Sequence, residues 1–310
     1  MPRQLSTVVF DLGGVVLQWA PQLPYEQVLP AAEVPGFMEA IDFPVWNRSH
    51  DAGEPFEVGE QRLIERFPES EDAVRAYRQH FDRSLTGMVP GTGAVIAELQ
   101  LAGVRLLGLT NWCAETFPHA ERRFGLLQRF EAIVVSGRER LAKPDPAIFE
   151  LLCGRHQVSP AQCAFVDDSP ANVAAAASLG ITAIQFHDAA ALRAELVSLG
   201  LLGARPQVRE PLFHLTQADV WRSADTAGAF PWSTRDVTFE RQGYVHCSFR
   251  DQIPTIRELV YADVADRDLV LLEVDPTGLD VVVEDLDTGA AYPHLYEPLP
   301  VTAVRSASPL

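Results

Sequence analysis

The sequence predicts an α/β protein with a Rossmann-like, doubly wound parallel sheet and an inserted helical cap, followed by a small α+β domain. Three observations support this prediction. Helical segments that end at glycine alternate with short apolar stretches from residue 92 to residue 200. The stretch from about residue 18 to residue 88 has helical spacing and no strand pattern. After residue 203, short strands separated by turns replace the alternation.

The parallel sheet is expected to begin with a buried strand at residues 5–10 and to continue after the cap. From there each helix precedes a strand, which is the pattern of βα units with helices on both faces of the sheet. In such sheets, ligands bind at the carboxyl ends of the strands. The expected pairs are helix 92–101 with strand 104–109, helix 114–124 with strand 132–135, helix 146–155 with strand 163–166 and helix 171–179 with strand 181–186, before a last helix at 189–199.

The rest of the chain divides into a cap, a linker and a second domain. Residues 18–88 are expected to form the cap, with helices near 58–67 and 71–81. Residues 204–211 carry prolines and charges and are interpreted as a linker between a first domain, 1–203, and a second, 212–310. The second domain is long enough to fold alone. Its expected elements are strands at 212–215, 244–247, 269–274, 281–284 and 301–305 and helices at 217–227 and 252–261.

The composition is that of an acidic globular protein. The chain has 25 Lys and Arg residues and 42 Asp and Glu residues, which give a formal net charge of −17. This charge argues against nucleic acid or an anionic membrane as the main partner. The four cysteines form no CxxC pair, and we expect reduced thiols in a cytoplasmic protein. We expect neither a signal peptide nor a membrane span.

Polar residues recur where the expected strands end. A carboxylate at the end of a buried strand is costly unless something uses it. Each of four such segments is a weak signal alone, but all four occur in order. The segments are Asp11-Leu12-Gly13-Gly14, Thr110-Asn111, Lys143-Pro144-Asp145-Pro146 and Asp167-Asp168-Ser169. In that order they resemble the four motifs of the haloacid dehalogenase superfamily, subfamily I with a helical cap, over about residues 5–200. Most members of that superfamily are phosphatases.

The resemblance implies a magnesium-dependent hydrolysis of phosphate esters. Asp11 would be the nucleophile and would form an aspartyl-phosphate. Mg²⁺ would be held by Asp11, the backbone carbonyl of Gly13 and Asp168, with Asp167 as a supporting acid. Lys143 would supply positive charge to the transition state. The substrate would be a small phosphorylated metabolite.

Four more residues would form the phosphate and substrate site. By the same resemblance, Thr110 and the amide of Asn111 would hold phosphate oxygens. Gly14 would let the backbone come close to the phosphate. Trp112 is interpreted either as a wall of the substrate pocket or as a hydrophobic anchor for the next helix.

One position departs from the family pattern. Phosphatases of this superfamily usually have a second Asp two residues after the nucleophile, which protonates the leaving group and activates water. Here that position is Gly13, and such a general acid–base is worth about 10²–10⁴-fold in rate. Three interpretations are open. A cap residue such as Trp46, Arg48 or His50 substitutes, the enzyme prefers good leaving groups, or the domain binds a phosphoester and turns over slowly.

Two alternatives to a magnesium phosphatase remain. A metal-independent 2-haloacid dehalogenase would also use a lone Asp nucleophile. The pair Asp167-Asp168 argues against it, since carboxylates crowded beside Asp11 resist joint ionisation unless a cation is bound. The other alternative is a non-catalytic regulatory protein that binds a phosphoester or a nucleotide.

The last hundred residues contain their own cluster of ring side chains. The segments Gly243 to Ser248 and Tyr292 to Tyr296 resemble a bacterial family of unknown function (number 952), over about residues 211–305. Its fold is similar to that of ADP-ribosyltransferases, which implies a nucleotide pocket. The histidines could instead form a zinc site with Cys247, or be satisfied by backbone hydrogen bonds. The pocket residues implied by the resemblance are His214, Tyr244, His246, His294 and Tyr296.

Overall fold

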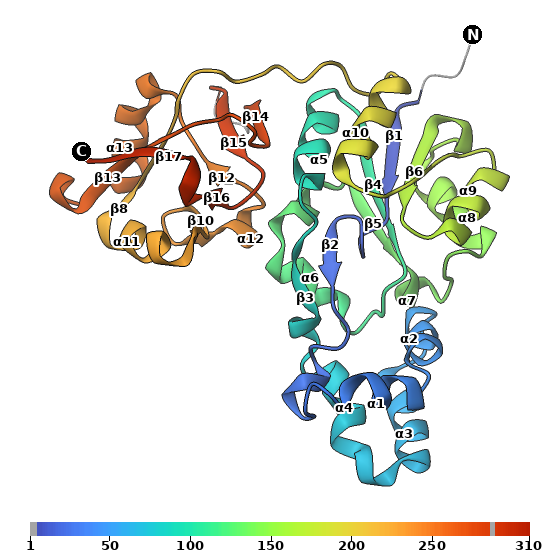
Figure 1. Cartoon of the computed structure of the whole chain (residues 1–310). Helices are drawn as coiled ribbons and strands as arrows, with labels where there is room; N and C mark the ends of the chain where they lie inside the picture. The colour runs from blue at the N-terminus through green and yellow to red at the C-terminus, as the bar shows by residue number, and fades with distance from the viewer. Residues whose placement is uncertain (1–4, 286–288) are drawn as a thin grey trace. The chain divides into compact units, whose positions relative to one another are not determined.

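The computed structural model describes residues 5–285 and 289–310 (Figure 1). Its contacts divide the chain into two compact units. The first comprises residues 1–92, 102–123 and 127–202, and the second comprises residues 93–101, 124–126 and 203–310. The linker at 204–211 and the domain limits beside it remain predictions.

A five-stranded parallel sheet forms the centre of the first unit, with the strand order β5-β4-β1-β6-β7. The predicted parallel sheet is therefore confirmed, and β1 is its central strand. All four residues of β1 are buried, which explains the unbroken run of apolar and β-branched residues in its sequence. The strands are β1 (Thr7–Phe10), β4 (Arg105–Thr110), β5 (Ala132–Val135), β6 (Cys163–Asp167) and β7 (Thr182–Gln185).

Helices that follow the strands pack onto the sheet. A core cluster joins Phe149 of α8 to Phe165 of β6, and Figure 1 shows α8 and α9 together on one side of the sheet. Asp145 caps α8 by accepting a hydrogen bond from the N–H of Ala147, and Pro146 follows at the first helical position. The helices are α6 (Phe117–Arg123), α7 (Ser136–Glu139), α8 (Pro146–His156), α9 (Pro170–Ser178) and α10 (Ala189–Ser198).

Two details of this unit differ from the prediction. The helix expected from residue 114 begins only at Phe117, because residues 114–116 form a turn after β4. The short helix α7 was not predicted, since four residues are too few to show a helical period.

The insert between β1 and β4 is a helical cap carried on two short strands. The prediction of no strands between residues 18 and 88 is wrong at both ends, because β2 (Leu17–Trp19) pairs antiparallel with β3 (Leu85–Met88). Strands of three and four residues are too short to show alternation. The cap core is aromatic and includes Tyr25, Phe43 and Tyr77. The cap helices are α1 (Val34–Ala40), α2 (Phe43–Asp51), α3 (Phe56–Arg66) and α4 (Glu71–Gln79).

The second unit is α+β, as predicted, and its sheets are antiparallel. One sheet has the order β17-β13-β8 and another the order β12-β15-β14. Residues 93–101 of helix α5 (Thr92–Leu101) are counted with this unit. The main strands are β8 (Leu212–Gln217), β12 (Val245–His246), β13 (Leu269–Val274), β14 (Val281–Glu284), β15 (Tyr292–Leu295) and β17 (Val304–Pro309). The helices of residues 212–310 are α11 (Ala218–Ala227), α12 (Phe239–Gln242) and α13 (Ile253–Tyr261).

The C-terminal strand lies later in the sequence than predicted. Residues 301–303 form a 3₁₀ turn, and the strand runs from Val304 to Pro309. Strand β15 was not predicted, because Pro293 interrupts its pattern. Two short strand pairs were also unpredicted, β16 (Leu299–Pro300) with β9 (Ala229–Phe230) and β10 (Trp232–Thr234) with β11 (Val237–Thr238). In the described ranges no helix has both the length and the apolar character needed to cross a membrane.

Candidate active site

Three adjacent strands of the parallel sheet end at one place. Asp11 follows β1 directly, Thr110 is the last residue of β4, and Asp167 is the last residue of β6. The N–H of Asp11 continues the sheet by donating to the carbonyl of Val166 at 2.8 Å. Since β1 lies between β4 and β6, the three predicted motifs meet at the carboxyl edge of the sheet.

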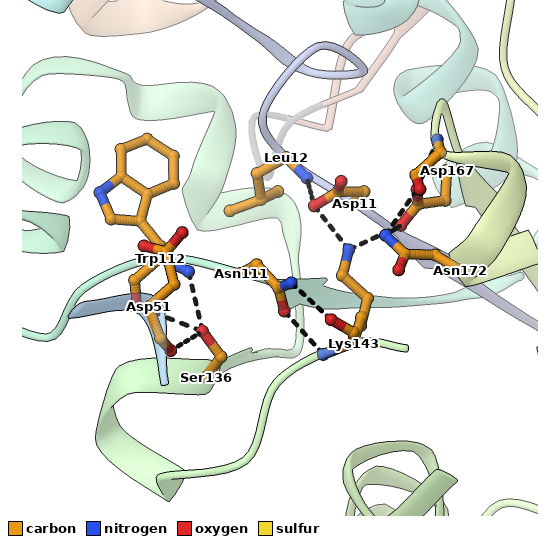
Figure 2. A network of polar contacts seen from close by, with 10 residues as sticks. Asp11, Leu12, Asp51, Asn111, Trp112, Ser136, Lys143, Asp167 and Asn172 are labelled. Carbon is orange, nitrogen blue, oxygen red and sulfur yellow. Dashed lines mark hydrogen bonds and ion pairs between the residues drawn. The ribbon is translucent and has the colours of Figure 1, made fainter. Parts of the chain in front are cut away.

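One oxygen of the Asp11 carboxylate is held and the other is open. Oδ1 accepts from the backbone N–H of Leu12 at 2.7 Å and lies 2.9 Å from Nζ of Lys143 (Figure 2). Oδ2 accepts no hydrogen bond from the described residues. Burial raises the pKa of Asp11 to about 7, the charge of Lys143 opposes this rise and the charge of Asp167 adds to it. Oδ2 is therefore the oxygen that this site offers to a ligand.

Lys143 is the central cation of the site. Its side chain is completely buried, and Nζ lies 2.6 Å from Oδ2 of Asp167 as well as beside Asp11. The side chain of Asn111 fixes the backbone of Lys143, because its Nδ2 donates to the Lys143 carbonyl and its Oδ1 accepts from the Lys143 N–H, both at 2.8 Å. The side chain of Asn111 thus positions Lys143. The prediction gave Asn111 only a contact with phosphate and did not include this role.

Asp167 is a buried carboxylate that the protein itself satisfies. Besides Lys143, it accepts from the N–H of Ser169 at 2.8 Å and from Nδ2 of Asn172 at 3.0 and 3.1 Å. It is fully buried, whereas its neighbour Asp168 lines the cavity described below. Asp167 therefore anchors Lys143 and Asn172, and Asp168 offers its carboxylate to the open side.

Gly14 is required by the backbone beside Asp168. Its φ angle is +77°, and a Cβ atom at Gly14 would lie 2.5 Å from Oδ2 of Asp168. At Gly13 an added Cβ would meet no atom within 4 Å. A side chain at Gly14 would therefore strain the backbone and displace the Asp168 carboxylate, whereas the space beside Gly13 is open.

The site fits a divalent cation that prefers oxygen ligands. Asp11, Asp167 and Asp168 each offer a carboxylate oxygen, and these atoms lie within 4.8 Å of one another. Burial raises the pKa of Asp168, and the charge of Asp167 adds to this rise. Mg²⁺ would relieve the crowding of negative charge, and hard carboxylate oxygens suit it. Within residues 5–285 and 289–310, the histidines and Cys247 of the second unit make no comparable group of ligand atoms.

A cavity of about 380 Å³ lies in front of this cluster. Trp112 is one of the walls of the cavity, which agrees with its interpretation as a wall of a pocket. Its ring also packs against that of Phe117 in the next helix, with ring centres 5.5 Å apart, which agrees with its interpretation as an anchor for that helix. The sheet edge contributes Asp11, Gly13, Gly14, Thr110, Asn111 and Asp168 to the lining; β2 and the loop after β4 contribute Leu17, Trp19, Trp112, Cys113 and Thr116; and the cap side contributes Asn47, Asp51, Tyr77 and Phe81.

The three cap residues suggested as substitutes for the missing Asp do not reach the cavity. Trp46, Arg48 and His50 are all absent from its lining within the described residues. His50 is completely buried, its Nδ1 lies 2.9 Å from the carbonyl of Glu54, and its ring stacks on Phe56. Burial lowers the pKa of His50. The structure therefore offers no support for His50 as the acid.

Asp51 is the cap carboxyl that does line the cavity, and sequence reasoning missed it. It is the last residue of α2, and its carbonyl accepts from Oγ of Ser136 at 2.5 Å. Ser136 also accepts from the N–H of Trp112 at 2.9 Å, as Figure 2 shows. Burial raises the pKa of Asp51 to about 7, and the charge of Asp11 adds to this rise. No spacing in the sequence distinguishes Asp51 from the other acidic residues of the cap.

In the second unit, the predicted pocket residues lie together around Glu284. Nδ1 of His294 lies 3.0 Å from Oε1 of Glu284, and the hydroxyl of Tyr296 donates to the same oxygen. The ring of Tyr244 lies 4.2 Å from that of His294 and 4.9 Å from that of His246. Glu284 was not among the predicted pocket residues, although its place at the end of an apolar strand is a signal.

His214 belongs to the same polar cluster through the backbone. Its Nδ1 lies 2.7 Å from the carbonyl of His246, and its ring packs edge-on against Phe230. Burial lowers the pKa of His214 to about 4. These contacts are all internal to the unit and give no support for the predicted nucleotide ligand.

Sequence comparisons match both units. A family of "haloacid dehalogenase-like hydrolase" proteins matches residues 5–180, and a "Protein of unknown function (DUF952)" family matches residues 215–307. The chain is 28% identical over 199 residues to acyl-CoA dehydrogenase family member 10 of Mus musculus, which covers 59% of this chain but only 18% of that protein. It is 26% identical over 188 residues to a phosphoglycolate phosphatase of Vibrio cholerae, covering 57% of this chain and 82% of that enzyme.

Solved structures give a weaker likeness. A HAD family enzyme from Bacteroides thetaiotaomicron, solved with magnesium and inorganic phosphate, superposes with a TM-score of 0.47 and 17% identity. The match covers 59% of this chain and 95% of that enzyme.

Proposed function

The chain belongs to the haloacid dehalogenase-like hydrolases, and we propose that it is a Mg²⁺-dependent phosphatase that acts on a small phosphorylated metabolite. The observation that carries this proposal is the group of three carboxylates, Asp11, Asp167 and Asp168, around the buried cation Lys143. The likeness to a phosphoglycolate phosphatase over more than half of the chain supports the same class of reaction.

In this proposal Asp11 is the nucleophile. Its open Oδ2 attacks phosphorus, the bond from phosphorus to the leaving oxygen breaks, and an aspartyl-phosphate forms. Lys143 holds Oδ1 and neutralises negative charge during the transfer. Thr110 and Asn111 line the cavity beside the expected phosphate. Water then attacks phosphorus, which releases phosphate and restores the Asp11 carboxylate.

Mg²⁺ would be held by Asp11, Asp168 and the carbonyl of Gly13, with Asp167 in support. When bound, it supplies positive charge that offsets the repulsion between a carboxylate nucleophile and an anionic phosphate. The acidic chain as a whole would repel such a substrate, so the local cations matter.

The cap would select the rest of the substrate. Trp19, Tyr77, Phe81 and Trp112 give the cavity apolar walls, and its volume of about 380 Å³ suits a small metabolite. Closure of the cap over the substrate would keep bulk water away from the reacting atoms.

The carboxylate cluster also favours a phosphatase over a dehalogenase. One buried cation, Lys143, faces two of the three carboxylates, and further negative charge beside Asp11 would be unfavourable without a bound cation. A metal-free dehalogenation needs no such cluster.

The proposal is tested by phosphate release from a panel of phosphomonoesters, measured with Mg²⁺ and then with EDTA. The matched blank is Asp11→Asn, which keeps the shape of the side chain. We expect release that depends on Mg²⁺ and is lost in the variant. No release under any condition, together with thermal stabilisation by inorganic phosphate and Mg²⁺, would instead support a non-catalytic binding protein. Dehalogenation of 2-haloacids without metal would support the dehalogenase.

A further inference from the structure

The proposed reaction needs a proton donor that the first motif lacks. When the ester bond breaks, the leaving oxygen carries negative charge, and an alkoxide is a poor leaving group unless it is protonated. Gly13 stands where the family has its second Asp, and it has no side chain. Some other group on the cavity must supply the proton if the enzyme cleaves alkyl phosphates.

We propose that Asp51 is the catalytic acid and base of this site, and that it replaces the missing Asp from the opposite, cap side of the cavity. The inference rests on the proposed phosphatase function and deepens it. Asp51 and Asp11 line the same cavity. Among the described residues of that lining, Asp51 is the one carboxyl outside the group of candidate metal ligands.

The position of Asp51 is fixed from two sides. Within α2, Nδ2 of Asn47 donates to Oδ2 of Asp51 at 3.0 Å. From the sheet side, Oγ of Ser136 donates to the backbone carbonyl of Asp51 and accepts from the N–H of Trp112 (Figure 2). Trp112 follows Thr110 and Asn111 in the loop after β4, so the cap carboxyl is tied to the segment that borders the expected phosphate. Catalysis requires such a fixed geometry.

Burial, with the charge of Asp11, keeps Asp51 partly protonated near neutral pH. Burial is the main cause of its raised pKa of about 7, and the negative charge of Asp11 adds to it. The Cys113 N–H, Arg48 and Lys143 act in the opposite direction. An acid–base catalyst works best when its pKa lies near the working pH.

The other titratable groups on the cavity outside the carboxylate cluster do not suit this role. Burial raises the pKa of Cys113 to about 11 and raises that of Tyr77 well above its ordinary value. Neither group would readily give up its proton and take it back at neutral pH. Asp51 can do both.

The two proton transfers balance. In the first step Asp11 forms a bond to phosphorus, the bond to the leaving oxygen breaks, and the proton of the Asp51 carboxyl moves to that oxygen. In the second step the oxygen of a water molecule attacks phosphorus, and the Asp51 carboxylate takes a proton from that water. The bond from phosphorus to Asp11 then breaks, and Asp51 is again protonated.

The test compares wild type with Asp51→Asn, which keeps the size of the side chain, and with Asp72→Asn, an exposed change of the same charge on cap helix α4. Two substrates are used: an alkyl phosphate that wild type hydrolyses and p-nitrophenyl phosphate, whose leaving group needs no proton. For Asp51→Asn we expect alkyl phosphate hydrolysis to fall about 10²–10⁴-fold. With p-nitrophenyl phosphate we expect a burst of one product per enzyme at nearly the wild-type rate, followed by slow turnover. Asp72→Asn should behave as wild type.

A rescue variant separates a catalytic role from a structural one. Gly13→Asp, added to Asp51→Asn, places a carboxyl where an added Cβ meets no atom within 4 Å, and it should restore part of the alkyl phosphate activity. Undiminished alkyl phosphate hydrolysis by Asp51→Asn would overturn this inference alone. The inference would also be overturned if Asp51→Asn lost the hydrolysis of both substrates equally, showed no burst with p-nitrophenyl phosphate and was not rescued by Gly13→Asp. No phosphate release by wild type would overturn the proposed function and this inference together.

Discussion

The ammonium group of Lys143 lies 2.9 Å from Oδ1 of Asp11, and this lysine is the only one in the sequence. The other 24 basic side chains of the Lys and Arg total are therefore arginines. A lysine at this place is a compact point charge that fits between two buried carboxylates, whereas a planar guanidinium is larger. The site thus depends on one cation that no neighbouring lysine can replace.

Removal of this cation should destabilise the fold. In Lys143→Met the carboxylates of Asp11 and Asp167 stay buried without their partner. We expect the free energy of unfolding, measured with urea in EDTA at pH 7, to fall by about 3–5 kcal/mol. The control is Arg155→Met, which removes an exposed ion pair with Glu139 and should cost about 0–1 kcal/mol. Similar losses of unfolding free energy in the two variants would contradict the prediction that Lys143 stabilises the fold by neutralising buried carboxylates.

The burial of Lys143 also predicts its reactivity. An amine-directed acylating reagent should leave the Lys143 side chain unmodified in the folded protein and modify it in urea. Because the chain has one lysine, mass spectrometry of the peptide that contains it gives an unambiguous readout. Rapid modification of the folded protein would show that the site opens far more than the structure indicates.

The backbone at Gly14 should control activity separately from stability. Gly14→Ala introduces a Cβ at 2.5 Å from Oδ2 of Asp168, at a φ of +77°. Gly103→Ala has nearly the same φ, +74°, but its Cβ would meet no atom within 4 Å. Both variants should lose about 1–2 kcal/mol of stability from the left-handed backbone. Only Gly14→Ala should lose most of the phosphatase activity and bind Mg²⁺ more weakly, as isothermal titration calorimetry can measure. Equal activity in the two variants would contradict a role for the Gly14–Asp168 contact.

The pH dependence of the rate should report the ionisation of Asp51. Its pKa is raised to about 7, so the protonated acid is present below that pH and is lost above it. For an alkyl phosphate whose ester cleavage limits the rate, measured at saturating Mg²⁺ so that Asp11 stays ionised, kcat should fall as pH rises through about 7. In Asp51→Asn the lower residual rate should lack this decline. A wild-type profile that stays flat from pH 6 to pH 9 would contradict the assignment.

The second unit should become less stable in mild acid. Burial depresses the pKa of His214 in the fold from 6.5 to about 4, so the unfolded chain binds a proton that the folded chain excludes. The contribution of neutral His214 is therefore complete above pH 6.5 and is lost as pH falls towards 4, by an amount on the order of 3 kcal/mol. Urea unfolding of wild type and His214→Gln between pH 4 and pH 8 checks this. The two stability curves should converge towards pH 4, and parallel curves would contradict the prediction.

Much of the first unit could be predicted because its signals are local. The run of apolar residues before Asp11 and the helix–strand alternation fixed a parallel sheet, and parallel strands bring residues at their carboxyl ends together. The approach of Asp11, Thr110 and Asp167 follows from that rule alone. Strands β2 and β3 were not predicted, because they are short and pair across opposite ends of the cap.

The sequence alone determined which strand ends carry carboxylates, since a buried charge before a turn is visible without coordinates. Only the tertiary structure decided which cap residue faces them. His50 and Asp51 are neighbours in α2, yet the packing of the aromatic cap core buries His50 while Asp51 lines the cavity. That choice depends on contacts such as Ser136 with Asp51, which lie 85 residues apart in the chain. Side-chain packing over such separations has no period in the sequence, which is why the cap residue opposite Asp11 could not be read from it.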